Sequence, residues 1–344
     1  MKKTLLLLAG LSVCSVYAQD ALRANLNGLR AGDRIIKQQM EFISPGDDGE
    51  NVLWDFSGLG AIEEDYLLIY YHENEEELSQ LTGWEHQTNY FFKQRGDSLL
   101  MTGYSNRFAE MFFHNPEIQI VFPFSFGDSV YSTFSGNGRY YQEMEMTASG
   151  HTLLKANAKG TLITPTTDTL KNVLRIKRLR EYDNMGVENV GMLLETHLWY
   201  APGYRYPIFE TVKSMIIRDD VTDDDYVTAF YFPLAGLENL QEDPENDAIR
   251  EEMKQDAGIL IACQVSPNPV ENDCYLNFEL STDAKVTIRL CDIMGNYILP
   301  IIIMENLQEG QHQKNIAMNG LRRGNYVIHI QANDYVTSKI VVKK

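Results

Sequence analysis

The chain has 344 residues, of which 48 are acidic and 30 are basic, and its formal net charge at pH 7 is −18. Such an acidic surface repels phosphate groups, which argues against nucleic acid and anionic lipid as partners. The length allows a sizeable core domain and a second, smaller one. With only four cysteines, a scaffold built on disulfides is excluded.

Residues 1–18 have the pattern of a Sec signal peptide. Lys2 and Lys3 form its positive end, residues 5–13 form its apolar core, and the small-residue cleavage site lies between Ala18 and Gln19. The apolar run is too short to span a bilayer. We therefore expect the Sec translocon to export the chain, and the mature protein to begin at Gln19 with a net charge of −20.

Residues 19–237 are predicted to form a β-rich cargo domain. Aromatic and β-branched runs alternate with turn residues every eight to fifteen positions, which favours a large antiparallel β-sandwich or a barrel without deciding between them. Gly136-Asn137-Gly138 is the strongest hairpin-turn signal, and helical patterns are confined to 74–81 and 246–255. The expected strands are 52–56, 66–71, 90–92, 98–104, 108–113, 118–122, 129–134, 139–147, 151–163, 169–180, 192–200, 206–217 and 226–232.

Several polar motifs are candidates for a metal or adhesion site. His72-Glu73 and Glu85-His86 are pairs of adjacent residues, which point to opposite faces of a strand and so rarely share one ion. The acidic cluster 219–225 could hold calcium, but it lacks the glycine and the acidic spacing of a calcium loop. Arg95-Gly96-Asp97 has the residues of a tight turn. We expect polar loops at these positions, no metal site and no cofactor.

Four aromatic residues surround the turn Pro202-Gly203. If they were exposed, their flat rings could stack on sugars, whereas alternating aromatics beside a turn are more often core. The sequence is compatible with both arrangements. The residues are Trp199, Tyr200, Tyr204 and Tyr206.

The sequence contains no recognisable catalytic motif. It has no GxSxG elbow, no phosphate-binding loop and no cysteine between residues 19 and 237 that could act as a nucleophile. Acidic residues are abundant, so a secreted, glycosidase-like hydrolase with paired carboxylates about 5–10 Å apart is the alternative to a non-catalytic domain.

Residues 238–263 are predicted to be an acidic linker with at most one short exposed helix. The segment contains Pro244 and lacks a wide apolar face. A peptidase that releases the cargo needs an extended, accessible chain, and this segment is expected to supply one.

Residues 264–344 are predicted to form a small antiparallel sandwich. Apolar and polar residues alternate along 274–280, 285–290 and 326–331, as in half-buried strands. Eight acidic and eight basic residues make this module neutral, so the excess negative charge lies in the cargo and linker. The cysteines that follow the leader all lie in or beside this module, and their odd number leaves at least one thiol free. They are Cys263, Cys274 and Cys291.

The C-terminal module resembles the type A sorting domain of the type IX (Por) secretion system of Bacteroidetes. The resemblance rests on the entry Pro267-Asn268-Pro269, the segment 286–295 that ends at Gly295, the pair Gly324 and Tyr326, and the terminal basic strand with Lys339 and Lys343. It implies an immunoglobulin-like sandwich that the outer-membrane translocon reads. It also implies removal by a sortase-like surface peptidase, often with attachment of the cargo to lipopolysaccharide.

The cargo segment 32–59 is loosely similar to uncharacterised secreted proteins with the same tail, and this similarity implies no activity. The sequence thus predicts an exported, all-β protein that is extracellular or attached to the outer-membrane surface. Its cargo would be a non-catalytic binding or structural domain with a glycan or protein ligand.

Overall fold

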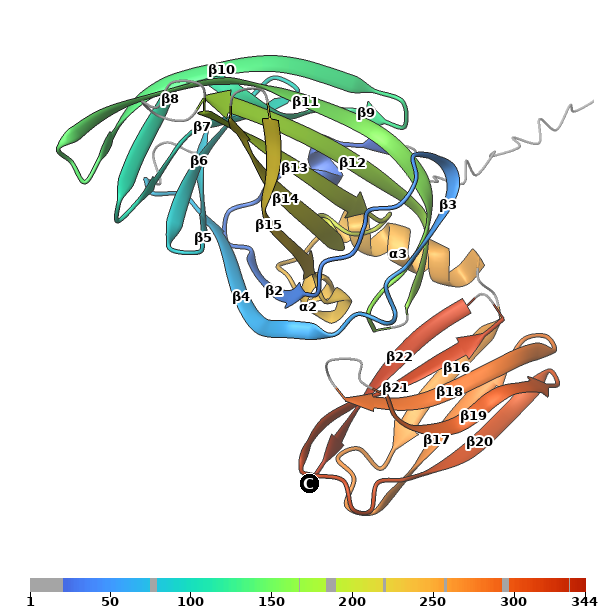
Figure 1. Ribbon diagram of the computed structural model, residues 1–344. Coiled ribbons are helices and arrows are strands. Elements are labelled where there is room, and N and C mark those ends of the chain that lie inside the picture. The colour runs from blue at the N-terminus through green and yellow to red at the C-terminus, as the bar shows by residue number, and fades with distance from the viewer. Residues whose placement is uncertain are drawn as a thin grey trace, which may run out of the picture.

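A computed structural model describes residues 21–74, 79–166, 168–183, 190–218, 221–256, 259–292, 297–333 and 335–344. Strands dominate both parts of the chain (Figure 1), which confirms the prediction of an all-β protein with a small C-terminal sandwich. Within the described residues, no helix combines the length and the apolar composition needed to cross a membrane.

The cargo domain is a barrel, which settles the choice that the sequence left open. Its sheet runs in the order β10-β8-β7-β6-β5-β4-β2-β15-β14-β13-β12-β11-β3, and β10 also pairs with β11, so twelve strands close into a ring. The ring strands are β2 (Arg34–Met40), β4 (Ala61–Tyr71), β5 (Gln80–Glu85), β6 (Thr88–Arg95), β7 (Ser98–Asn106), β8 (Ala109–Val121), β10 (Ser129–Tyr140), β11 (Met144–Ile163), β12 (Thr169–Asp183), β13 (Val190–Tyr200), β14 (Phe209–Arg218) and β15 (Val221–Tyr231).

A strap, residues 41–60, covers the outside of the barrel wall. It contains β3 (Gly49–Asp55), which pairs in parallel with the end of β11, where β10 no longer reaches. Trp54 and Phe56 of the strap pack edge-on against the ring of Trp199 in β13. Leu198, the neighbouring residue, faces the barrel interior and packs in a separate cluster. Both faces of this wall are therefore buried.

The turn predicted at Gly136-Asn137-Gly138 is wrong. These residues lie inside β10 and pair on one side with β8 and on the other with β11, while the chain reverses at residues 141–143. A Cβ atom at Gly138 would lie 2.0 Å from the carbonyl oxygen of Glu110. The glycines therefore permit close contact between strands, which is a second use of glycine in β structure.

Three helices close one end of the barrel: α1 (Ala24–Asn27), α2 (Leu234–Glu238) and α3 (Pro244–Asp256). The segment predicted to be a linker is bound to the barrel over much of its length. The Arg205 guanidinium donates to both carboxylate oxygens of Asp243 at 2.8 and 2.9 Å, and Asn246 Nδ2 donates to the Leu26 carbonyl at 2.9 Å.

The helix expected at 246–255 is confirmed as part of α3. Of the helix expected at 74–81, 75–78 lie outside the described residues and 80–81 begin strand β5.

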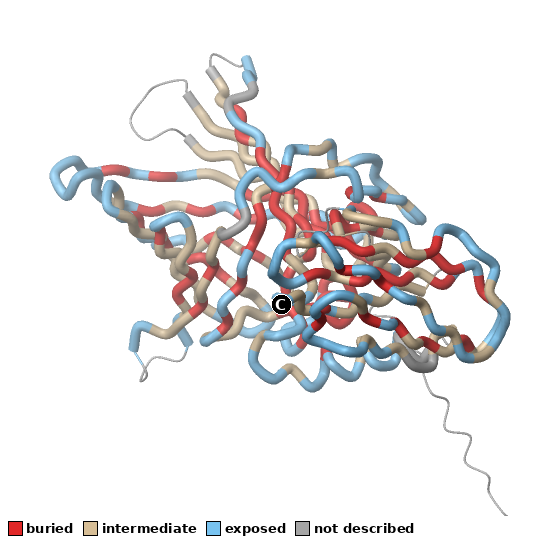
Figure 2. Tube along the Cα trace, turned by 90° about the horizontal axis from the view of Figure 1, so that it is seen from below, coloured by how far each residue is buried: buried red, intermediate tan, exposed pale blue. Residues whose placement is uncertain are grey.

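The C-terminal module is a sandwich of two sheets. The first has the order β16-β17-β20 and the second β19-β18-β21-β22, and their inward residues form one apolar core. The first strand begins at Leu260, before the predicted boundary at residue 264. Figure 2 shows buried positions along the middle of the strands and exposed ones at the hairpin tips. The strands are β16 (Leu260–Ser266), β17 (Asp273–Leu280), β18 (Ala284–Asp292), β19 (Tyr297–Leu307), β20 (Gly310–Ala317), β21 (Gly324–Ala332) and β22 (Tyr335–Lys343). A separate pair, β1 (Ala21–Leu22) and β9 (Phe124–Ser125), packs its Leu22 and Phe124 into the interior cluster that contains Leu198.

Candidate functional site

The entry motif of the C-terminal module is fastened to the last strand of the chain. Asn268 Nδ2 donates to the Ile340 carbonyl at 2.9 Å, and the Val342 N–H donates to Asn268 Oδ1 at 2.9 Å. Just beyond, the Val270 N–H donates to the Val342 carbonyl at 2.7 Å. The entry segment therefore borders β22, although the two lie more than seventy positions apart in the sequence.

The other predicted sorting residues meet at the same end of the sandwich. Gly324 pairs with Lys343, and Tyr326 pairs with Val341. The Tyr326 ring is buried, and its hydroxyl donates to the Arg322 carbonyl at 2.7 Å. Lys339 lies further along β22, where it pairs with Ile328. Gly295 and the cleavage residues Ala18 and Gln19 lie outside the described residues.

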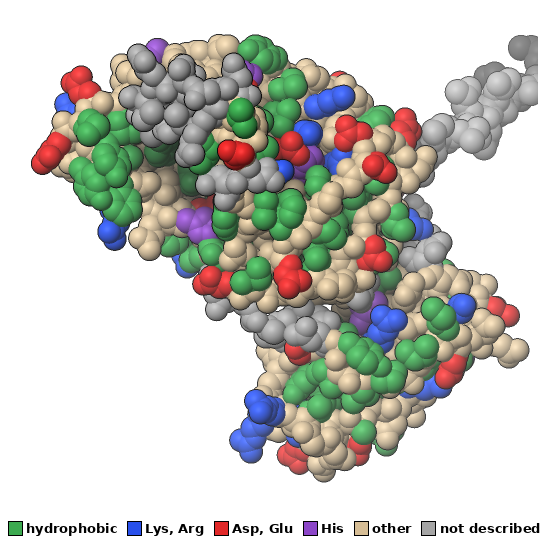
Figure 3. All heavy atoms as spheres, in the orientation of Figure 1, with side chains coloured by type: hydrophobic (Ala, Val, Ile, Leu, Met, Phe, Trp, Pro, Cys, Tyr) green, Lys and Arg blue, Asp and Glu red, His purple; other side chains and the backbone are tan. Residues whose placement is uncertain are grey.

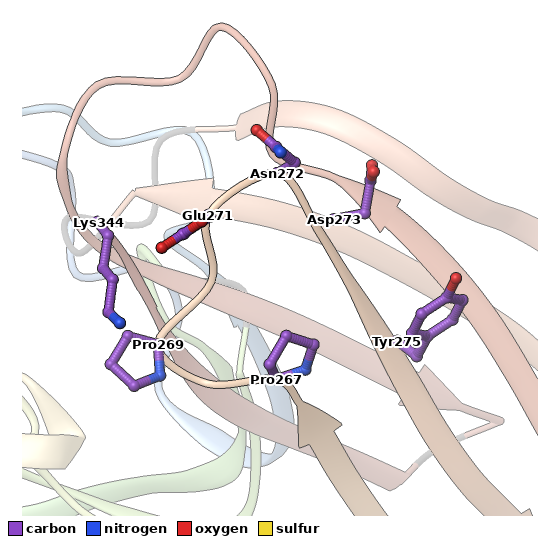
Figure 4. Close-up of a pocket in the computed structure, with 7 residues that line it drawn as sticks. All are labelled: Pro267, Pro269, Glu271, Asn272, Asp273, Tyr275 and Lys344. Carbon is purple, nitrogen blue, oxygen red and sulfur yellow. The ribbon is translucent and has the colours of Figure 1, made fainter.

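A shallow pocket of about 480 Å³ opens beside this junction (Figure 4). Two prolines of the entry motif, two acidic residues and Lys344 are among the residues that line it. The Lys344 side chain extends toward Pro269 in Figure 4. The full lining of the pocket is Pro267, Pro269, Glu271, Asn272, Asp273, Tyr275 and Lys344.

The aromatic residues considered as a sugar-stacking platform are packed inside the protein. Trp199 is fully buried, Tyr204 and Tyr206 are buried, and Tyr200 is half-buried. The Tyr206 hydroxyl donates to Asp33 at 2.8 Å, and its ring stacks on Tyr70 at 5.7 Å between centroids. The exposed platform is therefore not formed, because the strap and the helical end cover these rings.

The remaining polar motifs are dispersed. Arg95-Gly96-Asp97 makes the β6–β7 turn, with Gly96 at φ +57°. His72 bonds through Nδ1 to the Gln80 carbonyl at 2.6 Å. Of the acidic cluster, Asp219 and Asp220 lie outside the described residues. Among the side chains that the structure describes, no group of three or more His, Cys, Asp and Glu residues is placed to hold a metal ion.

The structure brings together three charged residues that the sequence did not single out as a group. Lys37 of β2 contacts Glu85 of β5 through its ammonium, and its Nζ lies 3.5 Å from Glu210 Oε2 of β14. Only 4 % of the Lys37 side chain is exposed, against 19 % for each glutamate. Lys37 Nζ also lies 4.2 Å from the centroid of the Phe230 ring. We call this group the interior triad.

The charges of the interior triad support one another. Burial alone would lower the pKa of Lys37, but attraction to Glu210 and Glu85 outweighs it and raises that pKa. Burial raises the pKa of Glu210, while Lys37 acts in the opposite direction. The ammonium is therefore charged at neutral pH, and two carboxylates share it.

His86 stands at the edge of the interior triad. It lies in the two-residue β5–β6 hairpin loop, where His86 and Gln87 have φ values of +47° and +60°, as in a type I′ turn. The His86 ring lies 4.4 Å from Tyr66 and 5.9 Å from Phe230 between centroids. Burial lowers the pKa of His86 below its usual value, so the ring is neutral at pH 7.

Comparison with known families bears on the C-terminal module. Residues 264–344 match the family model described as the secretion system C-terminal sorting domain. The match has the boundaries and the identity expected from the motif residues. No curated protein and no solved structure matches the chain. Residues 264–344 are therefore a type IX C-terminal sorting domain, and the chain is a protein delivered out of the cell by the type IX secretion system.

Proposed function

We propose that this protein is a Bacteroidetes surface or secreted binding protein. The Sec translocon takes it across the inner membrane by a leader that ends at Ala18. The outer-membrane translocon then reads residues 264–344, a sortase-like peptidase removes them, and the cargo is left outside the cell or attached to lipopolysaccharide. The barrel is the working part, and it binds a glycan or protein ligand without catalysis.

The observation that carries this proposal is the convergence of the sorting motif. Asn268, Tyr326 and Lys343 come from three places in the sequence, yet they meet at one end of the sandwich. A receptor can read such a surface only when the domain is folded, and the pocket beside it offers a contact of suitable shape.

The arrangement of charges supports binding rather than hydrolysis. A glycosidase needs one carboxyl group as an acid and a second as a nucleophile or base, with the scissile bond between them. Glu85 and Glu210 instead share the ammonium of Lys37, which occupies the space between them.

Deletion of residues 264–344 in the native host tests the delivery step. We expect the shortened chain to be retained in the periplasm after fractionation, while the full chain reaches the outside. A milder variant, Asn268→Ala, should reduce export without removing the domain, and Asn315→Ala on β20 of the other sheet is the matched control. Undiminished surface display of the deleted chain would refute the sorting role.

Mass spectrometry of the exported protein tests processing. Peptides from the barrel should be recovered, and peptides that contain Lys344 should be absent. Recovery of an intact Lys344 end from outside the cell would contradict removal of the sorting domain.

A further inference from the structure

The barrel is wide enough to leave room inside. Side chains fill the interior of a ring of about eight strands, and wider rings enclose cavities or channels. This ring has twelve strands, and several inward-facing residues remain only half-buried, including Tyr66, Tyr90, Tyr200 and Val212. Figure 3 shows the barrel hollowed on the face between the β5–β6 side and the β13–β15 side.

The interior wall carries balanced charge. The interior triad contributes two carboxylates and one ammonium, and Arg178 of β12 lies close enough to lower the pKa of Glu210. Arg178 faces inward, because it pairs with Leu154 of the interior core and its Nη2 donates across the barrel to the Gln119 carbonyl at 3.0 Å. Two positive and two negative groups therefore line this part of the interior.

Some of these polar groups have hydrogen-bonding capacity left over. Arg178 Nε is buried and has no hydrogen-bond partner among the described residues. The same holds for the hydroxyl of Ser132, which is 9 % exposed and lies on β10, opposite Thr152. A buried donor without a partner costs about 1–3 kcal/mol. A ligand that accepts hydrogen bonds inside the barrel would remove part of that cost.

We propose that the barrel interior binds a neutral, polyhydroxylated ligand of the carbohydrate class through Lys37, Glu85, Glu210 and Arg178. The inference rests on the proposed binding role of the cargo. Hydroxyl groups both donate to carboxylates and accept from ammonium and guanidinium groups, so a sugar satisfies all four residues. An anion would be repelled by the carboxylates and by the acidic chain, and a cation by Lys37 and Arg178.

The edge of the hollow suits the apolar face of a sugar. Tyr66 and His86 present rings there, and the Tyr66 hydroxyl is 3.3 Å from Gln39 Oε1. Gln39 in turn donates to Thr228 at 3.0 Å. Aromatic rings beside amide and hydroxyl groups supply stacking and hydrogen bonds at the same place.

A glycan array that carries neutral and acidic glycans tests the inference on the purified full chain. We expect binding to neutral glycans. Because each glutamate loses a charge-assisted hydrogen bond, Glu85→Gln and Glu210→Gln should weaken that binding about tenfold or more. Glu195→Gln, which alters a glutamate paired with Lys177 on the other face of the wall, should leave it unchanged.

A steric pair of variants guards against misfolding of the charge variants. Val212 lies two residues from Glu210 on the same face of β14, so Val212→Phe should block the interior while the interior triad stays intact. Val227 pairs with Lys213 on the opposite face of the sheet and is 41 % exposed, so Val227→Phe is the matched control.

The inference fails if no neutral glycan is bound, if acidic glycans dominate, or if Val212→Phe binds as tightly as Val227→Phe. These outcomes are measured on purified protein. They are therefore separate from the export assays, in which the delivery role can stand or fall alone.

Discussion

Arg175 fastens the strap to the barrel, and its replacement should destabilise the cargo domain strongly. Its side chain is fully buried between the rings of Trp54 and Trp199, with Cζ 5.7 and 5.9 Å from their centroids. Its guanidinium donates to the Asn157 side chain at 3.1 Å, to Asp48 at 2.6 Å and to the carbonyls of Pro45 and Gly46.

The expected loss for Arg175→Met follows from these contacts. Methionine fills a similar volume but donates no hydrogen bond. The buried Asn157 oxygen would lose its donor, which costs about 1–3 kcal/mol, and the charge-assisted bonds to the strap would be lost as well. The Pro45 carbonyl keeps a bond from Trp54 Nε1 at 3.1 Å, which limits the damage. We expect the free energy of unfolding to fall by about 3 kcal/mol.

Asp48→Asn is the matched control. The Asp48 side chain is 62 % exposed, so its ion pair is screened by water and should contribute about 1 kcal/mol or less. Urea unfolding followed by tryptophan fluorescence measures both variants. All three tryptophans lie in the cargo domain, so the signal reports the barrel even in the full chain. Equal losses for the two variants would refute the reasoning, because they would place the stabilisation in the exposed ion pair.

Three further predictions test separate features. Burial lowers the pKa of His197 to about 3, and the positive charges of Arg175 and Lys177 act in the same direction. Between pH 6.5 and 3 the unfolded chain therefore binds a proton that the native chain does not, so the free energy of unfolding falls as the pH falls. Urea unfolding should therefore show His197→Gln losing about 3 kcal/mol less than the parent between pH 7 and 4. Parallel losses would contradict the assignment. Gly138→Ala should cost about 2 kcal/mol or more, because its Cβ would meet the Glu110 carbonyl, whereas Gly60→Ala, with open space around it, should be near neutral in the same assay. Asn268→Ala should speed amide hydrogen exchange at residues 340–344, since two hydrogen bonds to β22 are lost, and Asn268→Asp, which keeps the acceptor for Val342, should have a smaller effect.

The sorting domain was predictable because its signals are local. The segments with period-two alternation, 274–280, 285–290 and 326–331, lie in β17, β18 and β21, and their apolar residues form the buried inner face of each strand. On the outer face of β18 and β21, Thr287 and His329 are buried as well. The meeting of Asn268 with β22 was not predictable, because it depends on how the sheets pair.

The interior triad could not be predicted for the same reason. Lys37, Glu85 and Glu210 come from strands that are distant in the sequence. In the ring, β4 separates β2 from β5 and β15 separates β2 from β14, and only this order brings the three residues together. Each residue alone looks like an ordinary polar position on a strand. The turn signal at Gly136 failed because glycine serves turns and close strand contacts equally well, and composition does not distinguish the two.

The place where the cargo ends can be tested by truncation. The sequence puts that end at residue 237, whereas the structure binds α3 to the barrel. A chain that ends at residue 237 loses Glu238, which accepts a bond from the buried Tyr204 at 2.8 Å, and Asp243, whose ion pair with Arg205 is 10–14 % exposed. It also leaves the Leu26 carbonyl without Asn246.

A chain that ends at residue 256 keeps all of these contacts. Each buried or charge-assisted bond contributes about 1–2 kcal/mol, so the shorter chain should unfold at least about 3 kcal/mol more easily in urea. Equal stability of the two would mean that α3 rests on the barrel without supporting it. If the difference is found, an export peptidase that must leave a stable cargo outside the cell has to cut beyond Asn246, because a cut before that residue would remove contacts that support the domain that the sorting tail delivers.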